Sequence, residues 1–86
     1  MSQYAVTFAR SARKELEALG RGLIARIMRP VESLARQPRP SGCRKLVGQE
    51  SLWRIRVGDY RVIYTVDDRS KVVDIVAIRH RSDAYR

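Results

Sequence analysis

Hydrophobic and polar residues alternate most regularly in two runs in the last third of the chain. The runs cover residues 52–57 and 60–66, and Gly58-Asp59 separates them. Such alternation is typical of β-strands with one buried face, and Gly-Asp between two such runs predicts a two-residue hairpin turn of type II′. That turn pairs Val57 with Tyr60, Arg56 with Arg61, Ile55 with Val62, and Trp53 with Tyr64.

The predicted hairpin has an apolar face and a basic face. The apolar face carries Trp53, Ile55, Val57, Tyr60, Val62 and Tyr64. Arg54, Arg56 and Arg61 share the other face. Like charges directly opposite each other destabilise a sheet, by roughly 0.2–1 kcal/mol, so the pairing of Arg56 with Arg61 predicts a bound anion. The alternative is an ordinary solvated face of an antiparallel sheet.

The first half of the chain predicts one strand and two helices. Residues 3–8 alternate and form a short strand. A first helix follows and ends at Gly20. An apolar stripe over residues 23–35 predicts a second helix. Because Pro30 lies inside this stripe and lacks a backbone donor, the sequence predicts a kink or a break near residues 26–30.

The remaining segments complete a single α+β domain over residues 1–86. A loop with two prolines and a glycine spans residues 37–42, a brief strand follows at 45–47, and the last strand covers 71–79. The predicted order is β-α-α-β-β-β, with a helical hairpin packed on one face of a small, mostly antiparallel sheet. The arginine face of the 52–66 hairpin then lies on the open side.

The net charge of the chain indicates which classes of partner it is expected to bind. Eighteen basic residues against nine acidic ones give a net charge of +9, and fifteen of the eighteen are arginine, whose planar fork binds phosphate bidentately. This favours a polyanionic partner, chiefly nucleic acid. A single cysteine, Cys43, excludes an internal disulfide and a cysteine metal cluster. With no signal peptide and no apolar segment long enough for a membrane span, a cytoplasmic location is expected.

Two strings of residues carry a resemblance to a known family. They read Trp53-Arg54-Ile55-Arg56-Val57-Gly58-Asp59-Tyr60-Arg61-Val62-Ile63-Tyr64 and His80-Arg81-Ser82-Asp83-Ala84-Tyr85-Arg86. Together with the order of elements, they resemble the RelE toxins of the RelE/ParE superfamily, which belongs to bacterial type II toxin–antitoxin systems. The resemblance extends over essentially the whole chain and is least specific in the helices.

The resemblance implies an enzyme that cleaves messenger RNA in the ribosomal A site and so inhibits translation. In RelE-like toxins the RNA 2′-hydroxyl attacks its own adjacent phosphate, and the bond to the next 5′-oxygen breaks without a metal or another cofactor. The implied partners are a cognate antitoxin, the ribosome with its ribosomal RNA, and messenger RNA, but no membrane. The net charge of +9 suits an acidic antitoxin segment.

The resemblance also assigns site residues. The family's basic strand positions fall on Arg54 and Arg56, the arginine of the next strand on Arg61, and the terminal tyrosine on Tyr85. The arginine near the C-terminus falls on Arg79 if positions are counted along the strand, and on Arg81 if the terminal strings are matched. Both are expected near the site.

A departure from the family pattern leaves the general base open. Arg54 and Arg56 stand where some relatives carry lysines, and arginine keeps its proton under ordinary conditions. Removing the 2′-hydroxyl proton then falls to His80 or to Tyr85. The ordinary pKa of histidine, about 6.5, suits this step, whereas that of tyrosine, about 10, would need nearby arginines to lower it. Tyr85 has the alternative role of stacking on an RNA base.

We expect Arg56 and Arg61 to hold the scissile phosphate and stabilise the charge of the transition state. Arg79 or Arg81 would neutralise or protonate the leaving 5′-oxygen, with neutralisation the better role for an arginine. Two other functions are compatible with the sequence. One is that of a ParE-like inhibitor of DNA gyrase, although ParE-like chains generally lack the arginine-rich face and the terminal tyrosine. The other is that of a non-catalytic basic domain, which binds nucleic acid in a salt-sensitive way without cleaving it.

Overall fold

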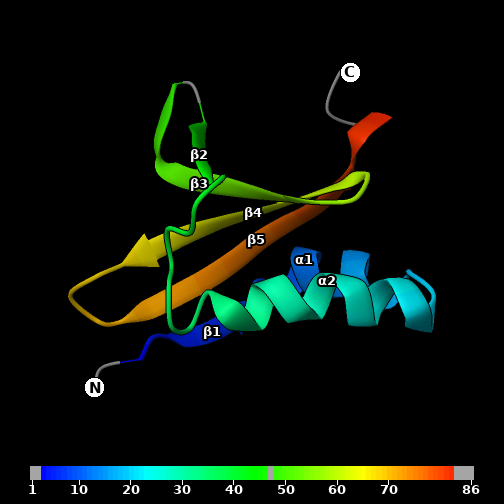
Figure 1. The fold of residues 1–86 in the computed structure, drawn as a ribbon, viewed down its shortest axis with the longest axis horizontal. Helices are drawn as coiled ribbons and strands as arrows, with labels where there is room; N and C mark the ends of the chain where they lie inside the picture. Colours follow the sequence, from blue (N-terminus) through cyan, green and yellow to red (C-terminus); the bar gives the residue numbers. More distant parts are fainter. Residues whose placement is uncertain (1–2, 47, 83–86) are drawn as a thin grey trace.

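The computed structural model describes residues 3–46 and 48–82. Its elements, in chain order, are β1 (Ala5–Phe8), α1 (Arg10–Glu17), α2 (Arg21–Ser33), β2 (Arg44–Leu46), β3 (Gln49–Val57), β4 (Tyr60–Asp67) and β5 (Val72–His80). Both helices cover one face of a single sheet, and the other face is open (Figure 1). The predicted α+β class is confirmed. No helix in the described ranges is long and apolar enough to cross a membrane.

The five strands form one sheet in the order β1-β5-β4-β3-β2. β1 pairs with β5 in parallel, and the other neighbouring strands pair antiparallel, so the sheet is mostly antiparallel as predicted. The brief strand expected at 45–47 is β2, which begins one residue earlier, whereas Val47 lies outside the described residues. β2 and the start of β3 rise above the open face (Figure 1).

The central hairpin of β3 and β4 has the predicted register. Val57 pairs with Tyr60, Arg56 with Arg61, Ile55 with Val62, and Trp53 with Tyr64. Gly58 has a φ of +60° while Asp59 is not among the residues of positive φ, which is the combination found in a type II′ turn. The turn prediction is therefore confirmed as well.

The hydrophobic core lies between the helices and the apolar face of the sheet. Its fully buried side chains are Ala12, Ile27, Val31, Leu34, Val62, Tyr64, Val73 and Ile75. Tyr64 is the largest of them, and its hydroxyl donates a hydrogen bond of 2.8 Å to the carbonyl of Pro38. This bond satisfies the polar end of a buried ring and fastens the loop after α2 to the sheet.

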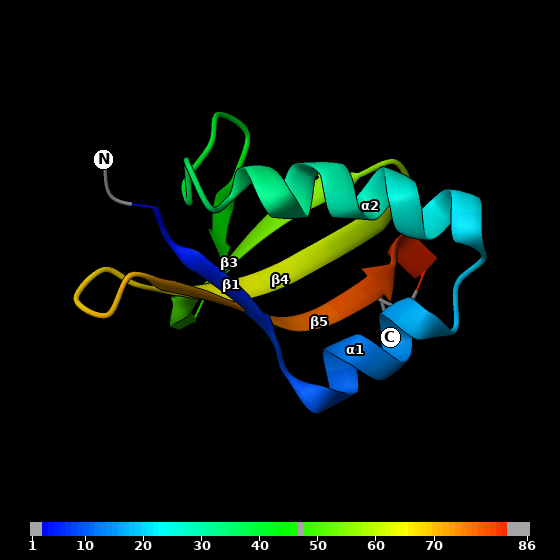
Figure 2. The ribbon, with the colours of Figure 1, turned by 90° about the horizontal axis from the view of Figure 1, so that it is seen from below.

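The two helices differ in what they cover. Seen from the helix side, α1 lies alongside β5, whereas α2 lies toward β4 and β3 (Figure 2). The predicted end of the first helix was three residues late, because α1 ends at Glu17 and Gly20 instead forms the N-terminal cap of α2. Gly20 has a φ of −71°, so it does not use the left-handed conformation expected of a terminating glycine.

Pro30 does not break the second helix. α2 continues from Arg21 to Ser33 with Pro30 inside it, so of the kink or break predicted near residues 26–30 the break was wrong, and the kink stays a prediction. Proline in a helix interior costs about 3 kcal/mol. Ile27 and Val31, on either side of Pro30, are both fully buried, and burying such side chains contributes about 1.5–3 kcal/mol each. Packing on both sides therefore keeps the two halves in one helix.

A polar cluster joins the β4–β5 turn to two distant segments. Asp68 accepts hydrogen bonds from the Tyr4 hydroxyl at 2.6 Å and from the two terminal nitrogens of Arg39 at 3.2 and 2.8 Å. The guanidinium of Arg39 also lies 5.3 Å from the ring centre of Trp53. The bond from Arg39, followed by that from Tyr4, lowers the pKa of Asp68 to about 2.

We predict that the Asp68 carboxylate stabilises the fold above about pH 4 and that this contribution is lost as the pH falls toward 2. The pKa of Asp68 in the folded chain lies below its ordinary value of about 3.9, so acid protonates the unfolded chain first and favours unfolding. Thermal unfolding midpoints of the parent chain and Asp68→Asn, measured from pH 5 to pH 2, should converge at low pH. A constant difference would contradict this origin.

Candidate functional site on the open face

Three arginines from three adjacent strands form one row across the open face. Arg61 on β4 is paired with Arg56 on β3 and with Arg79 on β5. Directly paired residues project from the same side of a sheet, and Arg56 and Arg61 alternate with the buried Ile55 and Val62. The arginine row, meaning Arg56, Arg61 and Arg79, therefore projects away from the helices, close to the β3–β4 turn.

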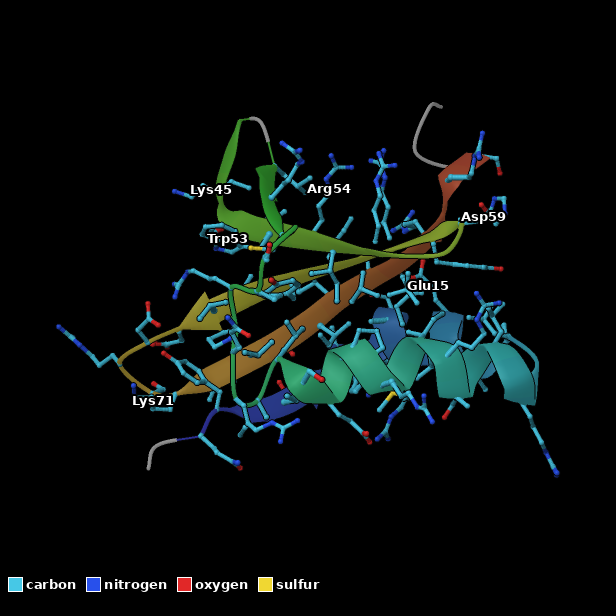
Figure 3. All side chains as sticks on the ribbon, in the orientation of Figure 1. Glu15, Lys45, Trp53, Arg54, Asp59 and Lys71 are labelled. Carbon is cyan, nitrogen blue, oxygen red and sulfur yellow. The ribbon has the colours of Figure 1, made fainter. Side chains whose placement is uncertain are left out.

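A second pair of arginines lies beside the row. Arg54 on β3 is paired with Arg44 on β2. Arg54 lies on the side of the sheet away from the helices, as Figure 3 shows. It is two residues from Arg56 along the same strand, so the two side chains share a face.

Two hollows adjoin Arg56. The smaller has a volume of about 210 Å³ and is lined by Arg56, Gly58, Asp59, Tyr60, Arg61 and Arg81. The larger, of about 510 Å³, is lined by Ser41, Gly42, Arg44, Arg54, Ile55 and Arg56. Because Arg56 lines both, the two hollows are neighbours along β3. Among these lining residues, Asp59 carries the only negative charge.

Glu15 from α1 holds Arg79 at the edge of β5. One carboxylate oxygen of Glu15 accepts the backbone N–H of Ile78 at 2.9 Å, and the other lies 3.1 Å from Nε of Arg79. β1 pairs with β5 only as far as Ile75, so Glu15 occupies the place that a neighbouring strand would take. Figure 3 shows Glu15 where α1 meets the sheet. The two Nη groups of Arg79 carry the remaining four donor hydrogens of its guanidinium.

Arg81 lies just beyond β5, at the rim of the smaller hollow. Its backbone N–H donates to the carbonyl of Asp59 at 2.7 Å, and its guanidinium lies 3.9 Å from the Asp59 carboxylate. The two side chains are 70% and 66% exposed, so this ion pair contributes little to stability. Both candidates for the C-terminal arginine are thus near the site, Arg79 in the row and Arg81 at the rim.

His80 lies on the opposite face from the arginine row. It is paired with Tyr60, which packs against the core, and the two rings meet edge to face with centres 5.1 Å apart. Its Nδ1 lies 3.2 Å from the backbone nitrogen of Ser82 and 2.9 Å from the Ser82 hydroxyl. The structure does not bring His80 together with the arginines.

The other residues that the sequence singles out are placed as follows. Arg54, Arg56, Arg61, Arg79 and Arg81 all lie around the open face. Tyr85 lies outside the described residues, so its assignment stays a prediction. Among the described residues, no group of three or more His, Cys, Asp or Glu side chains could hold a metal ion.

Glu15 and Arg44 belong to this site but were not singled out from the sequence. Glu15 had a readable signal, because it follows Ala12 by three residues and precedes Leu19 by four, which places an acid on the apolar side of its helix. For Arg44 there was no such signal, because the face of the sheet on which its side chain lies depends on how β2 pairs with β3.

Guanidinium groups hold phosphates and stabilise developing negative charge, but they do not take up protons near neutral pH. A row of three, drawn from three strands, offers donors in different directions to one tetrahedral anion. Its position beside two hollows on an open face gives room for a polymer on both sides. The arrangement therefore suits a phosphodiester of a nucleic acid strand better than a small buried ligand.

Comparison with known proteins identifies a family over nearly the whole chain. A family model described as the ParE toxin of the type II toxin–antitoxin system parDE matches residues 6–85. Toxin RelG of Mycobacterium tuberculosis is 34% identical over 87 aligned positions, which cover 96% of this chain and 97% of that protein.

Solved structures give the same answer at the level of the fold. The archaeal RelE–RelB complex from Pyrococcus horikoshii matches with a TM-score of 0.79 and 32% identity, covering 91% of this chain and 94% of that one. The toxin–antitoxin complex RelBE2 from Mycobacterium tuberculosis matches with a TM-score of 0.81 and 28% identity, covering 92% and 99%.

We predict that two substitutions of Glu15 separate its two contacts. Glu15→Ala leaves the backbone N–H of Ile78 without an acceptor and should lower the free energy of unfolding by about 1–3 kcal/mol. Glu15→Gln keeps an acceptor oxygen and loses only the half-exposed ion pair with Arg79, so the loss should stay within about 1 kcal/mol. Urea unfolding measures both, with the exposed Glu17→Ala as control. Equal losses for Ala and Gln would contradict the role of the edge hydrogen bond.

Proposed function

The chain belongs to the RelE/ParE superfamily of type II toxin–antitoxin toxins, and we propose that it is a ribosome-dependent endoribonuclease that cleaves messenger RNA. The observation that carries the proposal is the arginine row. Arg61 has an arginine as its direct partner on both sides, an arrangement that repels itself and that a bound phosphate relieves. Cleavage of messages in the A site would inhibit translation and arrest growth.

The proposed reaction is attack by the RNA 2′-oxygen on the adjacent phosphorus, with breakage of the bond from phosphorus to the next 5′-oxygen. Arg56 and Arg61 hold the non-bridging oxygens and stabilise the additional negative charge of the transition state. Arg79 is anchored through Nε by Glu15, and its Nη groups neutralise the charge that develops on the leaving 5′-oxygen, which then takes a proton from water. Arg81 adds its positive charge at the rim of the smaller hollow. No step in this scheme uses a metal.

The proton of the 2′-hydroxyl passes to a group outside the arginine row, because guanidinium groups keep their own protons. We assign this step to Tyr85 rather than to His80. His80 lies against Tyr60 on the opposite face of the sheet, and its Nδ1 is engaged by Ser82. Neighbouring guanidinium groups would favour the tyrosinate form and so lower the pKa of a tyrosine at this site.

The proposed partners are a cognate antitoxin, the ribosome and messenger RNA. The two solved structures reported above are complexes of a toxin with its antitoxin, which supports an antitoxin for this chain as well. The net charge of +9 favours an acidic antitoxin segment and, in its absence, the polyanionic surface of the ribosome.

A second function is favoured by one observation, the match of a family model described for ParE toxins. Under this alternative the chain inhibits DNA gyrase, and its arginines contact a protein or DNA surface without chemistry. We place it second because a row of three arginines supplies charge stabilisation that in-line cleavage of a phosphodiester uses, whereas inhibition of gyrase gives no reason for such a row.

We predict that Arg61→Ala and Arg79→Ala each lower cleavage of messages at least tenfold, which corresponds to about 1.4 kcal/mol or more of transition-state stabilisation. The measurement is induced expression followed by mapping of messenger RNA 5′ ends. His80→Ala is the control, because its side chain lies on the opposite face and should leave cleavage within about twofold.

Three outcomes would count against the assignment. If growth stops and DNA supercoiling is impaired while messages stay intact, the chain acts by the second function, inhibition of DNA gyrase. Unchanged cleavage in Arg61→Ala would remove the arginine row from the reaction. A folded His80→Ala chain that no longer cleaves would return the proton-transfer step to His80.

A further inference from the structure

The larger hollow on the open face extends beyond the reaction just described and shares only Arg56 with it. It lies on the side of Arg56 away from the β3–β4 turn, between residues 41–44 and β3, and has a volume of about 510 Å³. Its charged lining residues are Arg44, Arg54 and Arg56, with no acidic residue among the described residues that line it. β2, which begins at the lining residue Arg44, rises above the open face beside this hollow (Figure 1).

We propose that this hollow is a second phosphate subsite, which binds the phosphate next to the scissile one in a single RNA strand. Arg44 and Arg54 are its ligands. The identity of the strand as RNA rests on the proposed function, and the subsite adds a binding role for Arg44. It also implies a path for the strand, which runs along β3 from the arginine row toward β2.

The spacing of the two arginine groups supports this path. Arg54 and Arg56 are two residues apart on one strand, so their Cα atoms are separated by about 6.6 Å along β3. That is close to the distance between consecutive phosphates of an extended polynucleotide. Each position also has an arginine directly across the sheet, Arg44 for the first and Arg61 for the second. Paired arginines therefore repeat along β3 with nearly the period of an RNA backbone.

The local structure fixes the facing of Arg44. Its neighbour Lys45 is paired with Trp53 and lies 5.6 Å from the centre of that ring. Trp53 packs against the core, on the helix side of the sheet. Because neighbouring residues of a strand face opposite sides, a Lys45 held on Trp53 leaves Arg44 on the open side with Arg54. Ser41 adds a hydroxyl to the same wall.

A phosphate shared by Arg44 and Arg54 also relieves a repulsion. The two residues are directly paired, and like charges in that relation destabilise a sheet. The smaller hollow differs in this respect, because Asp59 in its wall lies 3.9 Å from Arg81. The charged side chains known to line the larger hollow are three arginines, which favours an anion there.

The test uses 2′-O-methyl trinucleotides, which cannot undergo 2′-hydroxyl attack. One probe carries two charged phosphates, and in two others one phosphate is replaced by a neutral methylphosphonate. Competition against a fluorescent oligonucleotide at low salt gives the affinity of the full chain for each probe. In the parent chain the second charged phosphate should raise the affinity about five- to tenfold. In Arg44→Ala the same phosphate should raise it less than about twofold.

Two variants control for folding and for net charge. Arg44→Lys keeps the charge and should retain part of the gain. Arg69→Ala removes the same charge from the exposed β4–β5 turn, away from the hollow, and should keep the full gain. The salt dependence gives a second readout, because losing one phosphate contact lowers the slope of log K against log salt by about 0.7 for a single strand. Only Arg44→Ala should show that decrease.

Two outcomes would overturn the subsite. One is equal loss in Arg44→Ala and Arg69→Ala, which would show general attraction by net charge. The other is no gain from the second phosphate in the parent chain. Neither readout uses the ribosome, so the two proposals fail separately. If the chain cleaves messages but the affinity gained from the second phosphate does not depend on Arg44, the endoribonuclease function stands and the subsite is ruled out. If that gain depends on Arg44 but the chain does not cleave messages, only the subsite stands.

Discussion

Neighbouring side chains of a strand face opposite sides of the sheet, so the pairing of β3 with β4 assigns every residue of the hairpin to a face. The type II′ turn at Gly58 fixes that pairing. One residue of slip would turn Ile55 and Val62 toward solvent and the arginines toward the helices. Burial of this apolar face and exposure of the arginines are therefore one constraint, and the core that stabilises the fold also holds the site in position.

The site places like charges on a surface whose stability comes from elsewhere. The direct pairing of arginines in the row is repulsive, while Val62 and Tyr64 on β4 are fully buried beneath it. The carboxylate of Glu15 compensates one member of the row and does so from another element, through Nε of Arg79. Positive charge is thus concentrated on one face of a rigid sheet, which suits a ligand that brings several negative charges at fixed spacing.

Sequence predicted the features that depend on local pairing. The register and turn of the hairpin follow from residues within a few positions of Gly58, and they were predicted correctly. The break at Pro30 was wrong because buried neighbours on both sides override a local preference. His80 was singled out because it belongs to the terminal string and its ordinary pKa suits proton transfer, and neither reason places its side chain relative to that of Arg79. β5 continues to His80, so strand alternation sends the two side chains to opposite faces. Arg44 could not be found without knowing how β2 pairs.

Glu15 has a consequence for association between copies of the chain. Beyond Ile75, no strand among the residues that the structure describes lies on the outer side of β5. An uncovered strand edge is a template for another chain to add a strand. The side chain of Glu15 takes the N–H of Ile78, and Ser11 donates to the carbonyl of Val76 at 3.5 Å. Helix α1 thus covers the part of the β5 edge that β1 does not pair with, so a strand of another chain cannot pair there. A second copy of the chain therefore finds no free backbone groups at these two positions through which it could extend the sheet.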